Sequence, residues 1–268
     1  MIRNSGTGEK NPDVEEWPAE EFPDNLTFFR AAIRALADKG VGHDGYLTVG
    51  FVGQQDLPGV ILRRAQSILR WDLRPSLWSH TFLVTGALGD GDPADLPLSE
   101  VSLHSRTGAF PDPAYNAVVT GKLGSYGNAA VDGNVGLVGI EMTDEQVHEV
   151  GERARFDFNR DRQRYSFWET LGIWHSYFWS AGAAPNPLRE GVPMFSSAFV
   201  EYCFEAIYLD LSPGASERNS APEHLWNAAL WWNEGFANLG HRMAGSYVVR
   251  DPGCAVADAP ASGPPGEG

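Results

Sequence analysis

The sequence predicts an α+β protein with one antiparallel sheet packed against helices. Short apolar runs with strand-type alternation are followed by separate amphipathic stretches, which is typical of this class. Apolar residues make up 43 % of the 268 residues and include nine Trp and fourteen Phe, enough for a sizeable core. We see no internal repeat, so we expect one domain rather than a repeat array.

Composition also sets the expected domain limits. Residues 1–23 are polar and acidic, and we expect a disordered lead-in. A single domain is expected over 24–249, with an N-terminal helix over 25–40 and a core over about 45–230. Residues 250–268 are rich in Pro, Gly and Ala, and we expect a disordered tail.

The first half of the domain alternates helices and strands. Asn25 is a residue type that caps helices, and Phe28, Ile33 and Leu36 follow it at helical spacing up to Gly40. The helix over 57–69 is expected to carry Arg63, Arg64 and Arg70 on its outer side. The expected elements are a helix over 25–40, a strand over 45–52, a helix over 57–69, a strand over 78–84, a turn over 89–97 and a strand over 98–103.

The second half holds the longer helices. Thr143 begins an acidic helix, with Asp and Glu in its first turn as the helix dipole favours. A long loop or a hairpin is expected over 105–134, because Gly, Asn and Pro recur there without periodicity. The remaining elements are a strand over 135–140, a partly helical aromatic segment over 167–179, a helix over 196–208 and a helix that begins at Ser220.

The net charge of −15 argues against nucleic acid or an anionic membrane surface as the main partner. No apolar run approaches the roughly 18–20 residues of a transmembrane helix. The first 18 residues lack the pattern of a signal peptide, so we expect a cytoplasmic location, with export without a leader left open. The oligomeric state is not predicted.

No cofactor or metal is expected. The segment over 40–45 fits the letters of a dinucleotide-binding loop, but it follows a helix and precedes a strand, the reverse of the required order. A calcium loop counted from Asp90 would place Val101 where a bidentate Glu is needed. Only Cys203 and Cys254 are present, too few for a cysteine zinc site.

Ser196 and Ser197 stand at the predicted start of the helix over 196–208. A hydroxyl there lies at the positive end of the helix dipole, which favours a developing anion by about 0.3–1 kcal/mol. Ser196 is therefore a candidate nucleophile, and the backbone amides of Ser196 and Ser197 are candidate oxyanion donors. The alternative is that these serines only cap the helix.

His80 is the candidate general base, because it begins an apolar strand and a rigid element can present one ring nitrogen to a cleft. Glu100 on the next strand can hold the other nitrogen and fix the tautomer. A core histidine and a solvent-facing strand carboxylate are the alternatives for these two residues. His104 and Glu141 are weaker candidates for the role of Glu100.

The order His80, Glu100, Ser196 resembles that of the permuted papain-like amidases, the circularly permuted relatives of the NlpC-type cell-wall peptidases. In that family the order is His, a polar residue, then Cys. Short stretches similar to the family occur in the same order over about residues 45–230. They are the opening strand over 45–49, the helix over 57–65, Trp78-Ser79-His80-Thr81, Glu100, the helix start over 141–146, the aromatic segment 165–168 with 171–172, Phe195-Ser196-Ser197-Ala198-Phe199-Val200 and Ala221-Pro222-Glu223-His224-Leu225.

The resemblance implies a permuted papain-like fold and acyl transfer to water at an amide or ester. The chain departs from the family at Ser196, which replaces the nucleophilic Cys. A serine hydroxyl must lose its proton during attack, whereas a cysteine can be held as thiolate. An engineered inactivation, a serine nucleophile and a natural pseudoenzyme all fit this replacement.

We therefore expect a hydrolase in which Ser196 attacks, His80 acts as general base and Glu100 orients the ring. The alternative is a catalytically inactive binding or interaction module. The substrates that the resemblance implies are peptides, cell-wall fragments and lipid acyl chains. Aromatic residues near the expected site favour an apolar substrate, and an aromatic core is the alternative; they are Trp78, Phe167, Trp168 and Trp174.

Overall fold

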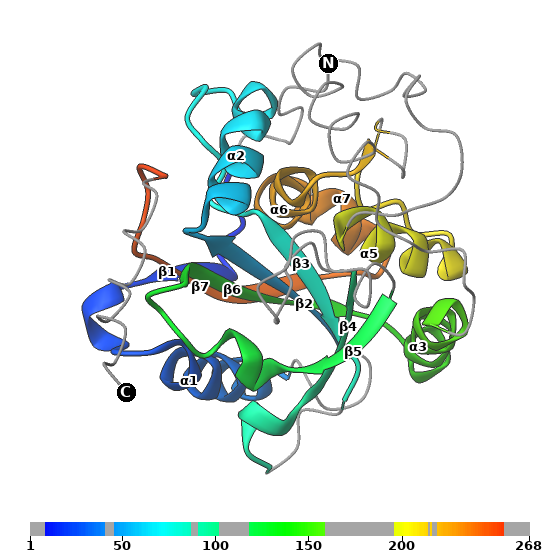
Figure 1. Cartoon of the computed structure of the whole chain (residues 1–268). Helices are drawn as coiled ribbons and strands as arrows, with labels where there is room; N and C mark the ends of the chain where they lie inside the picture. Colours follow the sequence, from blue (N-terminus) through cyan, green and yellow to red (C-terminus); the bar gives the residue numbers. More distant parts are fainter. Residues whose placement is uncertain are drawn as a thin grey trace, which may run out of the picture.

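A mixed seven-stranded sheet organises the protein (Figure 1). The computed structural model describes residues 9–40, 46–86, 91–101, 118–158, 196–213, 215 and 219–254. The strands are β1 (Val14–Trp17), β2 (Tyr46–Gln54), β3 (His80–Val84), β4 (Pro97–Val101), β5 (Val118–Lys122), β6 (Asp132–Glu141) and β7 (Met243–Val249).

The strand order is β1-β7-β6-β2-β3-β4-β5. The predicted α+β class is confirmed, and the pairs from β7 to β5 are antiparallel as expected. The prediction of a wholly antiparallel sheet is wrong at one edge, where β1 runs parallel to β7. Both β1 and β7 are strands that the sequence analysis did not identify.

The first of these strands also corrects the predicted disordered lead-in over 1–23. Val14 is buried against β7, and the side-chain amide of Asn11 donates to the backbone oxygens of Ala229 and Met243 at 3.0 Å each. These bonds attach the segment to the end of α6 and the start of β7. Four residues of strand are too short for a clear alternation pattern, which is why polar composition dominated the prediction.

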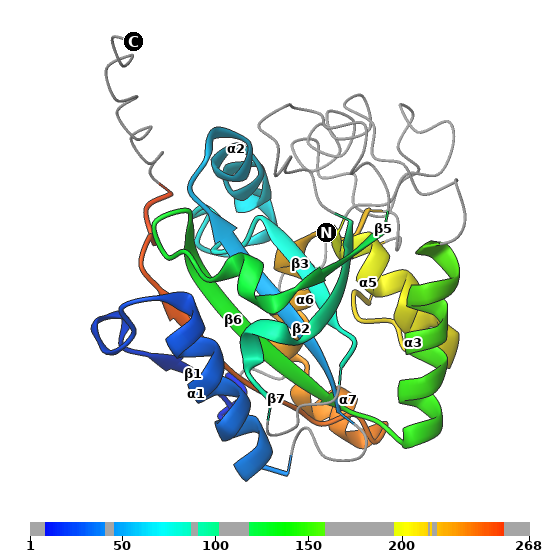
Figure 2. The same cartoon turned by 60° about the horizontal axis from the view of Figure 1, so that its bottom comes forward.

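Helices cover both faces of the sheet (Figures 1 and 2). On one face α1 packs on an apolar cluster that includes Phe28, Phe82 and Leu137. On the other face a second cluster joins α5 and α6 to Phe51 and Leu83. The helices are α1 (Asn25–Asp38), α2 (Leu57–Ala65), α3 (Asp144–Phe158), α5 (Ser196–Phe204), α6 (Pro222–Trp231) and α7 (Asn233–Asn238).

The start of α1 differs from the prediction in its cap. Asp24, not Asn25, caps the helix, and its carboxylate accepts from the amide of Thr27 at 2.7 Å. Asn25 is instead fully buried and donates to the backbone oxygens of Tyr126 and Asp132 at 2.9 Å each. The side chain therefore fixes the chain between β5 and β6 rather than the helix end.

The excursion expected over 105–134 contains a hairpin partner, as one of the two interpretations proposed. Strand β5 pairs antiparallel with β4, and the short 3₁₀ helix η4 (Leu123–Tyr126) follows it directly. Residues 102–117 and the aromatic segment over 167–179 lie outside the described residues.

The predicted helix over 57–69 consists of α2 and a terminal 3₁₀ turn, η2 (Gln66–Leu69), and its arginines are not all outward-facing. Arg63 is fully buried, and its guanidinium forms an ion pair with Asp251 at 2.7 Å. Arg63 also donates to the backbone oxygen of Ser76 at 2.9 Å. Burial of a guanidinium requires this full set of acceptors, because an unpaired buried charge is costly.

This ion pair corrects the predicted tail at its beginning. Residues 250–254 belong to the packed structure, since Asp251 and Cys254 are both buried. Asn134 of β6 accepts from the amides of Arg250 and Asp251 at 2.9 Å each. Residues 255–268 lie outside the described residues.

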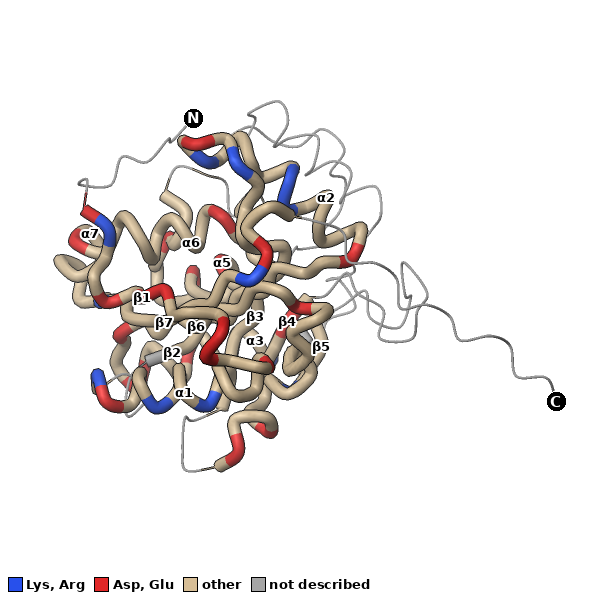
Figure 3. The backbone as a smooth tube through the Cα atoms, turned by 90° about the vertical axis from the view of Figure 1, so that its left-hand side faces the viewer, with Lys and Arg blue, Asp and Glu red and all other residues tan. Residues whose placement is uncertain are grey.

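Within the described ranges no helix is long and apolar enough to cross a membrane. Figure 3 shows acidic positions on most elements, and basic positions on α1, beside α2 and at several other points. The acidic residues of the described ranges are therefore not confined to one face.

Replacing the buried arginine tests the importance of the Arg63–Asp251 pair. Arg63→Met should lower the free energy of unfolding by about 3–5 kcal/mol, because it leaves the Asp251 carboxylate buried without its counter-ion. Urea denaturation followed by circular dichroism measures this loss. Arg30→Met removes the exposed pair with Asp92 and should cost at most about 1 kcal/mol. Equal effects of the two substitutions would contradict the assignment.

Candidate functional site

The strands β3 and β4 bring His80 and Glu100 together. His80 begins β3 and lies opposite Val52 of β2, while the β3–β4 ladder extends towards it only as far as Leu83↔Ser99. Continued by one pair, this register would place Phe82 opposite Glu100, which makes His80 a diagonal neighbour of Glu100 on the same face. Nε2 of His80 and Oε2 of Glu100 are 2.7 Å apart, and the residues are 3 % and 1 % exposed. The solvent-facing alternative for Glu100 is thereby excluded.

Tyr126 contacts the same carboxylate, and the sequence analysis did not identify it. Its hydroxyl donates to Oε2 of Glu100, and its ring stacks on Phe82 with centroids 4.9 Å apart. Tyr126 ends a short 3₁₀ turn within a Gly-rich stretch, so no periodicity marks it as a site residue. Only the return of the chain after β5 brings it beside β3.

Ser196 is the first residue of α5 and is 4 % exposed. Its Oγ accepts a hydrogen bond from the backbone amide of Thr81 at 3.2 Å. Thr81 follows His80 in β3, so the hydroxyl of Ser196 is hydrogen-bonded to the backbone of the residue next to the candidate base. Among the described residues, no direct hydrogen bond joins Ser196 to the His80 ring.

The two apolar clusters explain this arrangement. His80 packs near Phe82 and Tyr126, on the face that α1 covers. Phe199 of α5 packs with Leu83 in the cluster on the opposite face. Ser196 therefore reaches the strand in the plane of the sheet, at the point where β3 and β4 have separated and the Thr81 amide lacks a ladder partner.

Ser197 and Glu201 attach α5 to the chain that follows it. The hydroxyl of Ser197 donates to the backbone oxygen of Ser220 at 2.7 Å. The buried carboxyl group of Glu201 accepts from the amides of Leu211 and Ser212 at 2.7 and 3.1 Å. Burial, the largest effect, and the nearby Asp210 raise the pKa of Glu201 to about 8, although the Ser212 bonds oppose the shift.

Glu141, one of the alternatives for the role of Glu100, does not lie at this position. Glu141 is exposed and pairs with Tyr46 of β2, whereas His80 pairs with Val52 of the same strand. Tyr46 and Val52 are six residues apart, which corresponds to about 20 Å along a strand. His104 lies outside the described residues, as do the candidate substrate-binding residues Phe167, Trp168 and Trp174.

Trp78 lies in the core rather than at a surface. It is fully buried, and its ring lies 4.8 Å from that of Trp226 and 5.6 Å from that of Phe51 between centroids. The structure thus places it in an aromatic core, the alternative to a substrate contact.

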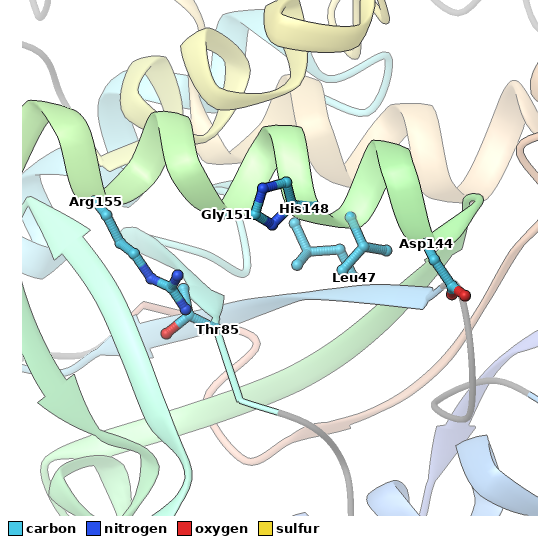
Figure 4. A pocket seen from close by; sticks show the side chains of 7 residues that line it. Leu47, Thr85, Asp144, His148, Gly151 and Arg155 are labelled. Atoms are coloured by element: carbon cyan, nitrogen blue, oxygen red, sulfur yellow. The ribbon is translucent and has the colours of Figure 1, made fainter.

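A separate pocket of about 280 Å³ lies between α3 and the sheet (Figure 4). His148 and Arg155 of α3 line it, together with Leu47 of β2 and Thr85. Thr85 follows the last residue of β3, whereas His80 is the first, so the pocket is at the other end of that strand. Arg155 is also paired with Glu152 at 2.8 Å.

The parts of the chain that the structure describes contain no group of three His, Cys, Asp or Glu able to hold a metal ion. His224 instead accepts from the amide of Ala221 through Nδ1 at 3.1 Å, and burial lowers its pKa to about 4. A neutral imidazole therefore stabilises the first turn of α6.

No protein-family model matches this chain, and a search of curated proteins finds no significant match.

The raised pKa of Glu201 predicts a stability change with pH. A folded-state pKa of about 8 lies above the ordinary value of 4.5, so the folded protein binds the extra proton between these values. Stability should therefore fall as pH rises from about 5 to 8. Glu201→Gln should remove this component, so its free energy of unfolding relative to wild type should increase over that range, as measured by urea denaturation. Glu234→Gln, at an exposed position of α7, is the control. A difference between wild type and Glu201→Gln that does not change with pH would contradict the assignment.

Proposed function

We propose that this protein is a hydrolase that transfers an acyl group from an amide or ester to water through Ser196, His80 and Glu100. The main support is the buried 2.7 Å contact between His80 Nε2 and Glu100 Oε2, with a helix N-terminal hydroxyl that accepts from the backbone amide of the residue after His80. Three residues separated by up to 116 positions in the sequence meet at the point where β3 and β4 separate. A nucleophile, a base and a group that orients the base are the parts that acyl transfer needs.

Each group has a defined role in this proposal. The contact with Glu100 holds the proton on His80 Nε2 and leaves Nδ1 as the basic nitrogen. Ser196 Oγ attacks the carbonyl carbon while its proton moves to Nδ1, and the imidazolium then gives that proton to the leaving group. Water hydrolyses the resulting acyl ester by the same base. Backbone amides at Ser196 and Ser197 are the proposed donors to the oxyanion.

The permuted papain-like fold is part of the same proposal. The arrangement that supports it is a histidine at the start of one strand, a carboxylate on the next, and the N-terminus of a later helix packed on both strands. The proposed substrates remain peptides, cell-wall fragments or lipid acyl chains.

An inactive binding module is the second candidate, and one observation favours it. The hydroxyl of Ser196 is used as an acceptor for the Thr81 amide and is almost fully buried. Attack requires the Ser196 side chain to turn towards Nδ1 of His80 when substrate binds. A pseudoenzyme would retain the bond to Thr81 permanently.

A fluorophosphonate probe separates these two functions. The probe should label wild-type protein at Ser196, because an activated serine hydroxyl attacks phosphorus. Ser196→Ala should abolish labelling, and His80→Ala should reduce it at least about 100-fold through loss of the general base. Peptide mass spectrometry identifies the labelled residue. No labelling of the folded wild-type protein would favour the binding module over the hydrolase.

Cysteine at position 196 tests whether the site activates a nucleophile. Ser196→Cys should react with iodoacetamide faster than Cys203 or Cys254, because position 196 lies at a helix N-terminus next to the strand of His80. Burial raises the pKa of the Cys254 thiol. The helix dipole and the imidazolium of His80 should stabilise the new thiolate. Alkylation rates by mass spectrometry should fall when His80→Ala is added.

Ser197→Cys is the matched control for this thiol. It places sulfur one residue along the same helix, where the native side chain contacts Ser220 instead of β3. Equal reactivity at positions 196 and 197, or reactivity independent of His80, would argue against a catalytic arrangement.

A further inference from the structure

We propose that Tyr126 is a positioning residue of this site, which holds the Glu100 carboxylate at His80 and shares its negative charge. The proposal assigns a fourth residue to the site and rests on the proposed function for its role in catalysis. The observation behind it is that one oxygen atom, Oε2 of Glu100, is the hydrogen-bond partner of both Nε2 of His80 and the hydroxyl of Tyr126.

The position of the Tyr126 ring is fixed by the sheet beneath it. Phe82 and Tyr126 stack at an interplanar angle of 8°, and Phe82 lies over Gly50 of β2, its directly paired residue. A Cβ atom at Gly50 would be 2.0 Å from the Phe82 ring, so only glycine allows this close approach. Gly50, Phe82 and Tyr126 thus form a packed column that ends at Glu100.

Two donors on one carboxylate oxygen have a chemical consequence. A hydrogen bond from the Tyr126 hydroxyl disperses the charge of Glu100, so the carboxylate stabilises an imidazolium less than it would alone. Tyr126 therefore favours the neutral ring that a general base needs, while keeping the carboxylate in place to orient it. Both groups are nearly inaccessible to water, which increases the effect of each bond.

Two titratable groups of the described residues contact the His80 ring. Glu100 comes from β4 and Tyr126 from η4. Strand β2 contributes Val52 opposite His80, and α5 contributes the hydroxyl of Ser196 at the adjacent residue. Removing the Tyr126 hydroxyl should therefore affect the protonation of the His80 ring through the Glu100 carboxylate that both groups contact.

The test is an NMR titration of the His80 ring, assigned by the signal that is lost in His80→Gln. Tyr126→Phe keeps the stacked ring and removes the hydroxyl. The ring should then become protonated at higher pH, with about a tenfold larger ratio of charged to neutral form at a fixed pH near neutrality. The matched control is Tyr247→Phe. It removes another hydrogen bond from a tyrosine hydroxyl to a glutamate, the 2.9 Å bond from Tyr247 to Glu16, and should leave the titration of His80 unchanged.

A second replacement predicts the opposite sign and preserves packing. Substituting 3-fluorotyrosine for Tyr126 makes the phenol a stronger donor, so the ring should become protonated at lower pH. A purely structural role would not give opposite shifts for the two changes. An unchanged titration in both would overturn the proposal.

This measurement needs no turnover, so it is independent of the proposed function. Absence of fluorophosphonate labelling together with opposite titration shifts would remove the hydrolase and keep the Tyr126 assignment. Labelling at Ser196 together with an unchanged titration would support the hydrolase and remove the Tyr126 assignment.

Discussion

The separation of β3 from β4 is the constraint on which the candidate site depends. Among the described residues these strands pair at Leu83↔Ser99 and Val84↔Leu98, and no further pair extends that ladder towards His80. A backbone amide without a strand partner must find another acceptor if it is buried. Ser196 supplies that acceptor to Thr81, and so the start of α5 is held at the opening of the sheet. The interrupted ladder thus explains the position of the helix, because Ser196 of α5 reaches the buried Thr81 amide where the β3–β4 pairing ends.

Buried polar networks hold the segments around this opening. Glu223 of α6 accepts from Ser76 at 2.6 Å and from Arg70 at 3.1 Å, which joins α6 to the chain between α2 and β3. Burial raises the pKa of Glu223 to about 7, although Arg70 and Ser76 lower it. Glu201 similarly joins α5 to the segment after it, through bonds from the Leu211 amide and the Ser212 hydroxyl. These carboxyl groups are fixed by many donors, which is how buried polar groups specify one arrangement of loops.

The presence of Ser rather than Cys at position 196 agrees with the hydrogen bond that the structure shows. A hydroxyl is a good acceptor for a backbone amide at 3.2 Å, whereas sulfur is a weak one. The same atom would have to leave this bond to attack a substrate. The balance between the Thr81 amide and the His80 ring as partners of Ser196 is therefore the physical difference between the proposed hydrolase and the proposed binding module.

The sequence by itself determined the α+β class, most helices and central strands, and the candidates His80, Glu100 and Ser196. These follow from local signals: apolar periodicity, acidic first turns, and polar residues placed in otherwise apolar elements. It did not reveal β1 and β7, because a four-residue edge strand is too short for a pattern and β7 is recognised only by its partner β6. The burial of Arg63 could not be predicted from a local pattern either, since its counter-ion Asp251 is 188 residues away.

Tertiary structure alone decided that Glu100, and not Glu141, reaches His80, and that Tyr126 joins them. Strand register and the return of the chain after β5 set those contacts, and both depend on pairings between distant residues that no local pattern encodes.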